Sequence, residues 1–229
     1  MKKLLTMSAL LLVALLLFTG CPKDPAPNGN GLPGTWSQSV QMFTNNRNCW
    51  SNKGTLIYDN TNKAFVFNLN AGELTGNDIP DSGKFDTWWF PVTTDANYTG
   101  FKATATTTQS TYCGFIFNLT EVSNQWSYYY IVLSDSKFML KKCINGTSSN
   151  ILSWTADDAI KPTPQENEVL VYKDTDSSII IKINGVTVYT ITSPEIHEGQ
   201  CGVVCCVSNT QYNNGTEITT TWKFKEFQR

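Results

Sequence analysis

Short runs of alternating apolar and polar residues, separated by turn-forming residues, constrain the fold of this chain more than any other feature. From Gly34 onward they recur about every ten to fifteen residues, and no window of about twelve residues has apolar positions at helical spacing. In the clearest example, residues 178–191, two alternating runs flank Asn184 and Gly185, a pair that favours a type I′ hairpin turn. The pattern predicts an all-β fold.

Further runs predict the other strands and one short helix. Residues 55–58 and 64–69 are expected to form a hairpin, and Asn145-Gly146 is expected to close another strand. The remaining expected strands are residues 100–106, 113–119, 127–134, 137–144, 168–172, 202–208 and 219–227. Residues 155–161, which a proline follows, are the only helical candidate. About twelve short strands without an internal linker predict a single antiparallel β-sandwich of two sheets, of jelly-roll type.

Residues 1–20 have the features of an export signal. Two lysines precede an apolar stretch that is too short, and wrongly flanked, for a stable transmembrane helix. The junction Thr19-Gly20-Cys21 that follows resembles the lipobox of bacterial lipoproteins, whose cysteine is lipidated and becomes the new N-terminus. The resemblance implies a membrane anchor of acyl chains on Cys21. An ordinary secretory signal with an incidental cysteine is the alternative.

Residues 21–34 separate this junction from the predicted domain. They contain four prolines and three glycines, a composition that cannot bury a core. They are therefore expected to form a flexible tether, with an end-to-end distance of about 20 Å. Residues 35–229 are expected to form a single β-sandwich domain.

The expected location is the cell envelope, with the protein lipid-anchored to a bacterial membrane. Pro22 replaces the Asp that resembles an inner-membrane retention signal, which favours the outer membrane or the cell surface.

Charge excludes one class of partner. Charged residues make up 16% of the chain and aromatic residues 12%, a balance typical of an uncharged, β-rich surface. The formal net charge is -2, and it becomes -4 once residues 1–20, with two lysines and no acid, are removed. No basic cluster is visible, so nucleic acid is not an expected partner.

From Tyr98 to the C-terminus, aromatic and glycine-initiated strands precede an Asn-Gly hairpin and a closing Gly-x-x-Gly turn. The segments are residues 98–103, 113–117, 168–172, 181–188, 199–203 and 222–227. Their order resembles the concanavalin A-like lectin and glucanase superfamily, in particular its laminin-G-like members and the 3-keto-disaccharide hydrolase domains. The resemblance implies a β-sandwich. It leaves function open, because lectins, hydrolases and adhesion modules share this fold.

The catalytic motif of that superfamily is missing. Its retaining glucanases carry Glu-x-Asp-x-x-Glu on one strand, which places two carboxyl groups on one face about 5 Å apart. This sequence contains no such motif. Glu166 and Glu168 share a face, but they follow a proline-containing loop and lack the central Asp. We interpret them as the solvated start of a strand, and catalysis is not expected.

The metal-binding residue types are sparse. His197 is the only histidine, which nearly excludes a catalytic zinc site. Asp157-Asp158 and Asp174-Thr-Asp176 are oxygen-rich and could hold Ca²⁺, although turn-forming aspartates are the more frequent explanation. Apart from Ca²⁺, no cofactor is expected.

Six cysteines remain besides Cys21. They are Cys49, Cys113, Cys143, Cys201, Cys205 and Cys206. Their even number and the export route predict at least two disulfides, and buried thiols are the alternative. Cys205 and Cys206 must point to opposite faces of one strand.

Adjacent aromatic residues mark candidate ligand contacts. Neighbours on an extended chain face opposite sides, so one of Trp88 and Trp89 must point away from the core, and the same holds in the run from Trp126 to Tyr130. An outward ring is either covered by a loop or available to stack against a sugar. The candidate ligand-binding residues are Trp88, Trp89, Trp126 and Tyr129.

These features together favour an envelope-anchored lipoprotein whose lectin-like domain binds a glycan or another extracellular ligand without catalysis. A sugar-processing hydrolase of the same superfamily is one alternative. An adhesin for host or matrix protein is another.

Overall fold

The computed structural model describes residues 54–59, 61–70, 85–91, 100–108, 112–123, 125–215 and 217–225. The chain divides into two compact units, Met1–Asn30 and Gly31–Arg229, and every described residue belongs to the second. The expected signal peptide, Cys21, the tether and Cys49 lie outside the described residues. Within these ranges no helix is long and apolar enough to cross a membrane.

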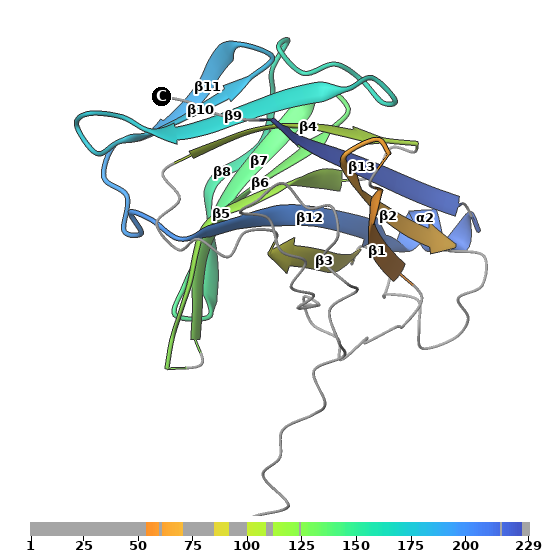
Figure 1. Cartoon of the computed structure of the whole chain (residues 1–229), viewed down its shortest axis with the longest axis horizontal. Coiled ribbons are helices and arrows are strands. Elements are labelled where there is room, and N and C mark those ends of the chain that lie inside the picture. The colour runs from red at the N-terminus through yellow and green to blue at the C-terminus, as the bar shows by residue number, and fades with distance from the viewer. Residues whose placement is uncertain are drawn as a thin grey trace, which may run out of the picture. The chain divides into compact units, whose positions relative to one another are not determined.

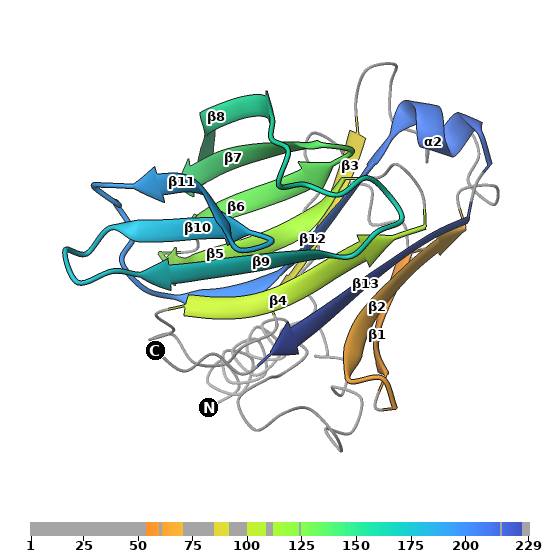
Figure 2. The same ribbon diagram turned by 90° about the horizontal axis from the view of Figure 1, so that it is seen from above.

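Thirteen strands in the described part of the chain form two antiparallel sheets, which confirms the predicted all-β sandwich (Figure 1). One sheet has seven strands in the order β1-β2-β13-β4-β9-β10-β11. Its members are β1 (Gly54–Asp59), β2 (Ala64–Asn70), β13 (Glu217–Lys225), β4 (Gly100–Thr107), β9 (Asn167–Lys173), β10 (Ile179–Ile183) and β11 (Val186–Ile191). Figure 2 shows β4, β13, β2 and β1 side by side in this sheet.

The second sheet has six strands in the order β3-β12-β5-β6-β7-β8. Its members are β3 (Phe85–Pro91), β12 (Gln200–Ser208), β5 (Tyr112–Val122), β6 (Gln125–Ser134), β7 (Lys137–Ile144) and β8 (Thr147–Ala156). Strands β5 to β8 form a meander, in which each strand pairs with the next along the chain.

The core lies between the two sheets. Phe67 and Trp222 from the seven-stranded sheet, and Phe115, Ile131 and Val203 from the six-stranded sheet, are all 0% exposed and belong to one apolar cluster. Burial of each such side chain contributes about 1.5–3 kcal/mol. Contact between the inner faces of the sheets therefore holds the sandwich together.

Two Asn-Gly pairs close hairpins as the sequence predicts. Asn145 and Gly146 have φ values of 47° and 76°, and Asn184 and Gly185 have values of 48° and 87°. A type I′ turn requires positive φ at both central residues, which glycine adopts freely and asparagine tolerates. These turns fix the β7–β8 and β10–β11 pairings.

The predicted helix at residues 155–161 is wrong. Its first two residues end strand β8, and a turn follows. Strand β8 was not expected because its sequence lacks an alternating apolar pattern, and as an edge strand it is exposed along most of its length. The short helix that does form, α2 (Asn209–Asn213), follows β12 instead.

Candidate ligand-binding face

Alternation along β6 directs its aromatic side chains to opposite faces of the six-stranded sheet. Tyr129 and Ile131 point into the core, where they are 1% and 0% exposed. Tyr128 and Tyr130 belong to a separate cluster on the outer face. The run of three tyrosines is therefore divided between the core and the outer surface.

The outer face of this sheet carries its own apolar residues, which we call the outer cluster. Its buried members come from β5, β6, β7 and β12: Ile116, Leu119, Tyr130, Val132, Met139, Val204 and Cys206. Tyr112, Trp126 and Tyr128 are half-buried and pack against it. Apolar residues outside the main core need a cover against water, and these three rings contribute to it.

Aromatic rings from distant strands meet on this face. The ring centroids of Trp154 on β8 and Tyr112 on β5 are 4.9 Å apart, although β6 and β7 separate the two strands. Neighbouring strands lie about 4.8 Å apart, so the two rings lean toward each other across about 14 Å of sheet. The centroids of Tyr128 and Tyr130 are 5.8 Å apart. We call Tyr112, Trp126, Tyr128, Tyr130 and Trp154 the aromatic face.

The aromatic face is accessible at its rim and closed at its centre. Trp154 is 39% exposed, whereas Tyr130 is 8% exposed. The other three rings are half-buried. A half-exposed ring offers a flat apolar surface together with a polar edge, so the rim is where a ligand can make contact.

Neutral polar groups and one cation lie beside these rings. The Lys141 Nζ lies 5.9 Å from the ring centroid of Tyr130, whose hydroxyl is hydrogen-bonded to Ser148. Asn150, the strand partner of Lys141, is exposed. Burial raises the pKa of both Tyr128 and Tyr130 above the usual tyrosine range. Their hydroxyls are therefore neutral at physiological pH.

Carboxylates are scarce in the six-stranded sheet. Its strands contain two, Asp86 in β3 and Glu121 in β5. Asp86 pairs with Val207 of β12. Leu119, two residues before Glu121, pairs with Gln200 of the same strand. The distance between Val207 and Gln200 along β12, at about 3.3 Å per residue, places the two acids more than about 20 Å apart along the sheet. Paired catalytic carboxylates lie within about 10 Å of each other. These strands therefore do not supply a catalytic pair.

The expectation that Tyr129 contacts ligand is wrong, because its side chain lies in the core. Its ring stacks on Phe117, with centroids 5.5 Å apart. Its hydroxyl accepts hydrogen bonds from the backbone N–H groups of Glu195 (2.8 Å) and Ile196 (3.3 Å). Tyr129 thus fixes the loop before β12. Trp126, by contrast, does lie on the aromatic face.

Trp88 and Trp89 lie in β3, whose backbone pairs with β12. Trp88 is opposite Cys205, and Trp89 is opposite Val204. Their side chains lie outside the part of the chain that the structure describes. A ligand-binding role for these two residues stays a prediction.

Sequence reasoning missed four members of the aromatic face. Strict alternation within the tyrosine run could have selected Tyr128 and Tyr130 once Tyr129 was assigned to the core. Trp154 was missed because strand β8 was not expected. Nothing local in the sequence indicates that Tyr112 and Trp154 meet.

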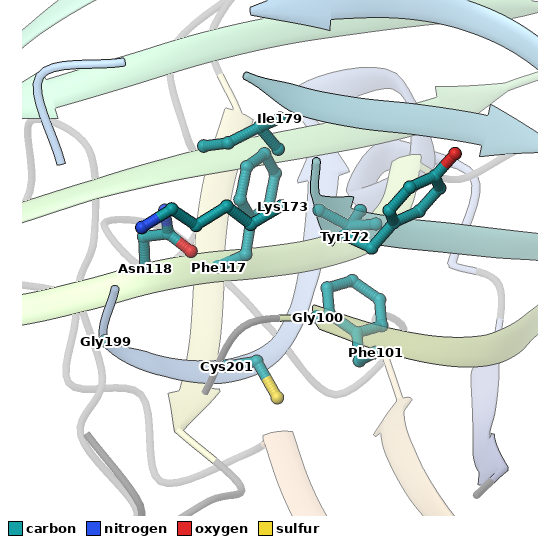
Figure 3. A pocket seen from close by; sticks show the side chains of 10 residues that line it. Gly100, Phe101, Phe117, Asn118, Tyr172, Lys173, Ile179, Gly199 and Cys201 are labelled. Atoms are coloured by element: carbon teal, nitrogen blue, oxygen red, sulfur yellow. The ribbon is translucent and has the colours of Figure 1, made fainter. Parts of the chain in front are cut away.

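A small pocket lies between the sheets, beside the start of β4 and the end of β9 (Figure 3). Phe101, Phe117, Asn118 and Lys173 are among the residues that line it. Its volume is about 10 Å³, which holds one water molecule at most. This pocket is too small for a sugar.

Glu168 is held as a carboxylate. Its Oε1 lies 3.1 Å from the Lys102 Nζ, and its Oε2 lies 2.9 Å from the Lys225 Nζ. Partial burial alone would raise the pKa of Glu168, but the hydrogen bonds from Lys225 and Lys102 outweigh it and lower the pKa below its ordinary value. An ionised, doubly paired carboxylate is a poor general acid, so the pair with Glu166 does not resemble a catalytic dyad.

The aspartates considered for Ca²⁺ stabilise turns. The side chains of Asp157, Asp174 and Asp176 accept hydrogen bonds from the backbone N–H groups of Ala159, Thr175 and Ser178, respectively. Among the described residues, no group of three or more His, Cys, Asp or Glu side chains is arranged to hold a metal ion. His197 lies on an exposed loop.

The prediction of at least two disulfides is wrong. All five described cysteines are thiols: Cys113, Cys143, Cys201, Cys205 and Cys206. Each is buried, and Cys205 and Cys206 belong to the core and the outer cluster, respectively, as alternation predicts. These five cysteines act as small apolar side chains.

Solved structures with similar folds include two β-glucanases. A β-glucanase of Bacillus licheniformis has 15% sequence identity and a TM-score of 0.56, over 87% of this chain and 94% of that chain. A prokaryotic β-1,3-1,4-glucanase (lichenase) from a mouse hindgut metagenome has 12% identity and a TM-score of 0.54, over 83% of this chain and 91% of that chain. The carbohydrate-binding module CBM66 of Bacillus subtilis aligns with a TM-score of 0.44 and 12% identity, over 84% and 92% of the two chains.

The two β-glucanase structures share the jelly-roll β-sandwich fold with this chain. No protein-family model matches the chain, and no curated protein sequence matches it.

Proposed function

We propose that this chain is an envelope-anchored lipoprotein whose β-sandwich binds a glycan on the aromatic face, without catalysis. The observation that carries the proposal is the contact between Trp154 and Tyr112, which presents partly exposed ring surface at the rim of the aromatic face. Sugar rings stack on aromatic side chains through their apolar faces, and their hydroxyls bond to neutral donors and acceptors. The β-glucanases that share the fold support a sugar-related role.

Two observations favour binding over hydrolysis. The sequence lacks the Glu-x-Asp-x-x-Glu motif, and the two acids of the six-stranded sheet are too far apart to act on one bond. Binding alone requires neither acid.

Attachment to the envelope is supported by the lipobox-like junction Thr19-Gly20-Cys21 and by the proline- and glycine-rich segment that follows. The test is growth with labelled fatty acid. Wild-type protein should incorporate the label, and Cys21→Ala should lose it and leave the membrane fraction or remain unprocessed. Equal incorporation by the variant would end the lipobox proposal.

The binding proposal is tested with the purified protein on a glycan array and a panel of matrix proteins, followed by product analysis of any bound glycan. The expected result is retention of at least one glycan class with no cleavage products. Cleavage would favour the hydrolase alternative. Binding to matrix protein alone would favour the adhesin alternative.

A further inference from the structure

A second hollow lies on the outer face of the seven-stranded sheet, away from the aromatic face. Its volume is about 300 Å³, and it is lined by Thr104, Lys161, Glu166, Glu168, Asn184 and Lys225. This volume is within the range of small-molecule sites. All six lining residues are polar, so a ligand here is recognised by charge and hydrogen bonds.

One wall of the hollow is the loop before β9, and that wall is firmly attached. The Asn184 Nδ2 donates to the Ala159 carbonyl oxygen (2.7 Å) and to the Asn167 Oδ1 (2.8 Å). The Thr106 Oγ1 donates to the Pro164 carbonyl oxygen at 2.8 Å. A wall fixed before binding lowers the entropy cost of holding a ligand.

The charges around the hollow favour an anionic ligand. Lys161 and Lys225 line the hollow, Lys102 is paired with Glu168 beside it, and Lys223 is the strand partner of Thr104, so these cations outnumber Glu166 and Glu168. Lys102 and Lys225 are both paired with Glu168.

Lys161 is the cation with spare hydrogen-bonding capacity. Within the described residues its Nζ donates only to the Glu166 carbonyl oxygen, at 3.4 Å. An ammonium group has three donors. Lys161 can therefore donate to an anionic group of a ligand.

Thr104 supplies a hydroxyl to the lining of the hollow. Most of the residue is buried, but its hydroxyl is not among the buried polar atoms that lack a partner, and no described residue is hydrogen-bonded to it. The hydroxyl is therefore available to a ligand hydroxyl in the hollow.

We propose that this hollow binds a uronic acid residue of a glycan, that is, a sugar with one carboxylate. Lys161 pairs with the carboxylate, and Thr104 and the Glu166 carboxylate bond to ring hydroxyls. The glutamates repel a dianion such as phosphate but accept hydrogen bonds from hydroxyls, which favours an acidic sugar over inorganic phosphate. The inference does not depend on ligand binding by the aromatic face.

The test is isothermal titration of the full-length protein with an oligogalacturonate, with the corresponding neutral galactose oligomer and with inorganic phosphate. The uronate should bind, and the neutral oligomer should bind at least roughly tenfold more weakly because it cannot pair with Lys161. Equal affinity for the two oligomers, or preference for phosphate, would overturn the proposal.

Variants locate the binding. Lys161→Gln and the isosteric Thr104→Val should each weaken uronate binding by roughly tenfold, and Lys137→Gln, an exposed lysine on the other sheet, should not change it. Uronate affinity at the wild-type level in Lys161→Gln would overturn the proposal even if Thr104→Val fails to fold. Trp154→Ala should leave uronate binding unchanged, which separates this site from the aromatic face. Loss of uronate binding in that variant would assign the ligand to the aromatic face instead.

Discussion

The rings of Trp154 and Tyr112 touch each other, with centroids 4.9 Å apart, across two intervening strands of the same sheet. Val132 and Met139, on the outer face of those intervening strands, are 0% and 7% exposed. The two rings therefore help to shield the middle of the sheet from water, while Trp154 itself stays 39% exposed.

Trp154→Ala is expected to weaken glycan binding by about 1 to 3 kcal/mol, the magnitude for removing a large apolar contact. Its melting temperature should fall only slightly, because the ring is already partly in water. The matched control is Tyr172→Ala, which removes a half-buried ring from the other sheet and should leave glycan binding unchanged. Equal loss of binding in both variants would contradict a site on the aromatic face.

Tyr129→Phe is expected to destabilise the fold by about 1 to 3 kcal/mol, because the backbone N–H groups of Glu195 and Ile196 lose their shared acceptor. Urea unfolding measures the change. Tyr189→Phe, at a partly buried ring on β11, is the control and should change stability little. An unfolding free energy for Tyr129→Phe equal to that of wild type would show that these hydrogen bonds contribute nothing.

Gly114→Ala is expected to prevent folding or to lower stability by more than about 3 kcal/mol, because a Cβ atom there would overlap the Ile131 carbonyl oxygen on β6. Gly146→Ala places its methyl group in open space, so its cost is the strain of a positive φ, about 1–2 kcal/mol. Thermal unfolding compares the two variants. A smaller loss in Gly114→Ala than in Gly146→Ala would contradict the close approach of β5 and β6.

The Glu168 ion pairs predict a dependence of stability on pH. Because folding lowers the pKa of Glu168 below the ordinary value of 4.5, the folded state binds this proton less readily than the unfolded state. The contribution of the Glu168 ion pairs to the free energy of unfolding is therefore fully present above the ordinary pKa of 4.5. It is lost as the pH falls through the lowered pKa of the folded state. Urea midpoints between neutral pH and about pH 3 should fall less in Glu168→Gln than in wild type. Parallel curves for the two proteins would show that the ion pairs do not affect folding.

Cys113 and Cys205 are expected to resist alkylation in the native protein and to react without reductant once the protein is unfolded. Burial, with a smaller effect from Cys206, raises the pKa of Cys113 to about 12, and burial raises that of Cys205 well above its usual 9.0. The reactive thiolate is therefore scarce at neutral pH. Peptide mass spectrometry after iodoacetamide treatment measures the extent of alkylation at each of the two cysteines. A requirement for reductant before either site reacts would restore the disulfide hypothesis.

The sequence by itself determined the features that depend on neighbouring residues. Alternating runs gave the all-β class and most strand positions, because side chains on an extended chain alternate between faces. The Asn-Gly pairs located two hairpins, because few other residues tolerate the positive φ of a type I′ turn. The same alternation separated Cys205 from Cys206.

Only the tertiary structure decided which faces became sites. The contact between Tyr112 and Trp154 joins residues 42 positions apart in the sequence, and it depends on strand order and on the edge strand β8, whose sequence carries no clear pattern. Tyr129 moved from candidate ligand contact to core because the adjacent sheet and the loop at Glu195 set its environment. Glu168 likewise met Lys102 and Lys225 only through the pairing of β9, β4 and β13. Local sequence encodes backbone conformation and the alternation of faces, but which elements lie beside each face follows from burying apolar surface over the whole chain.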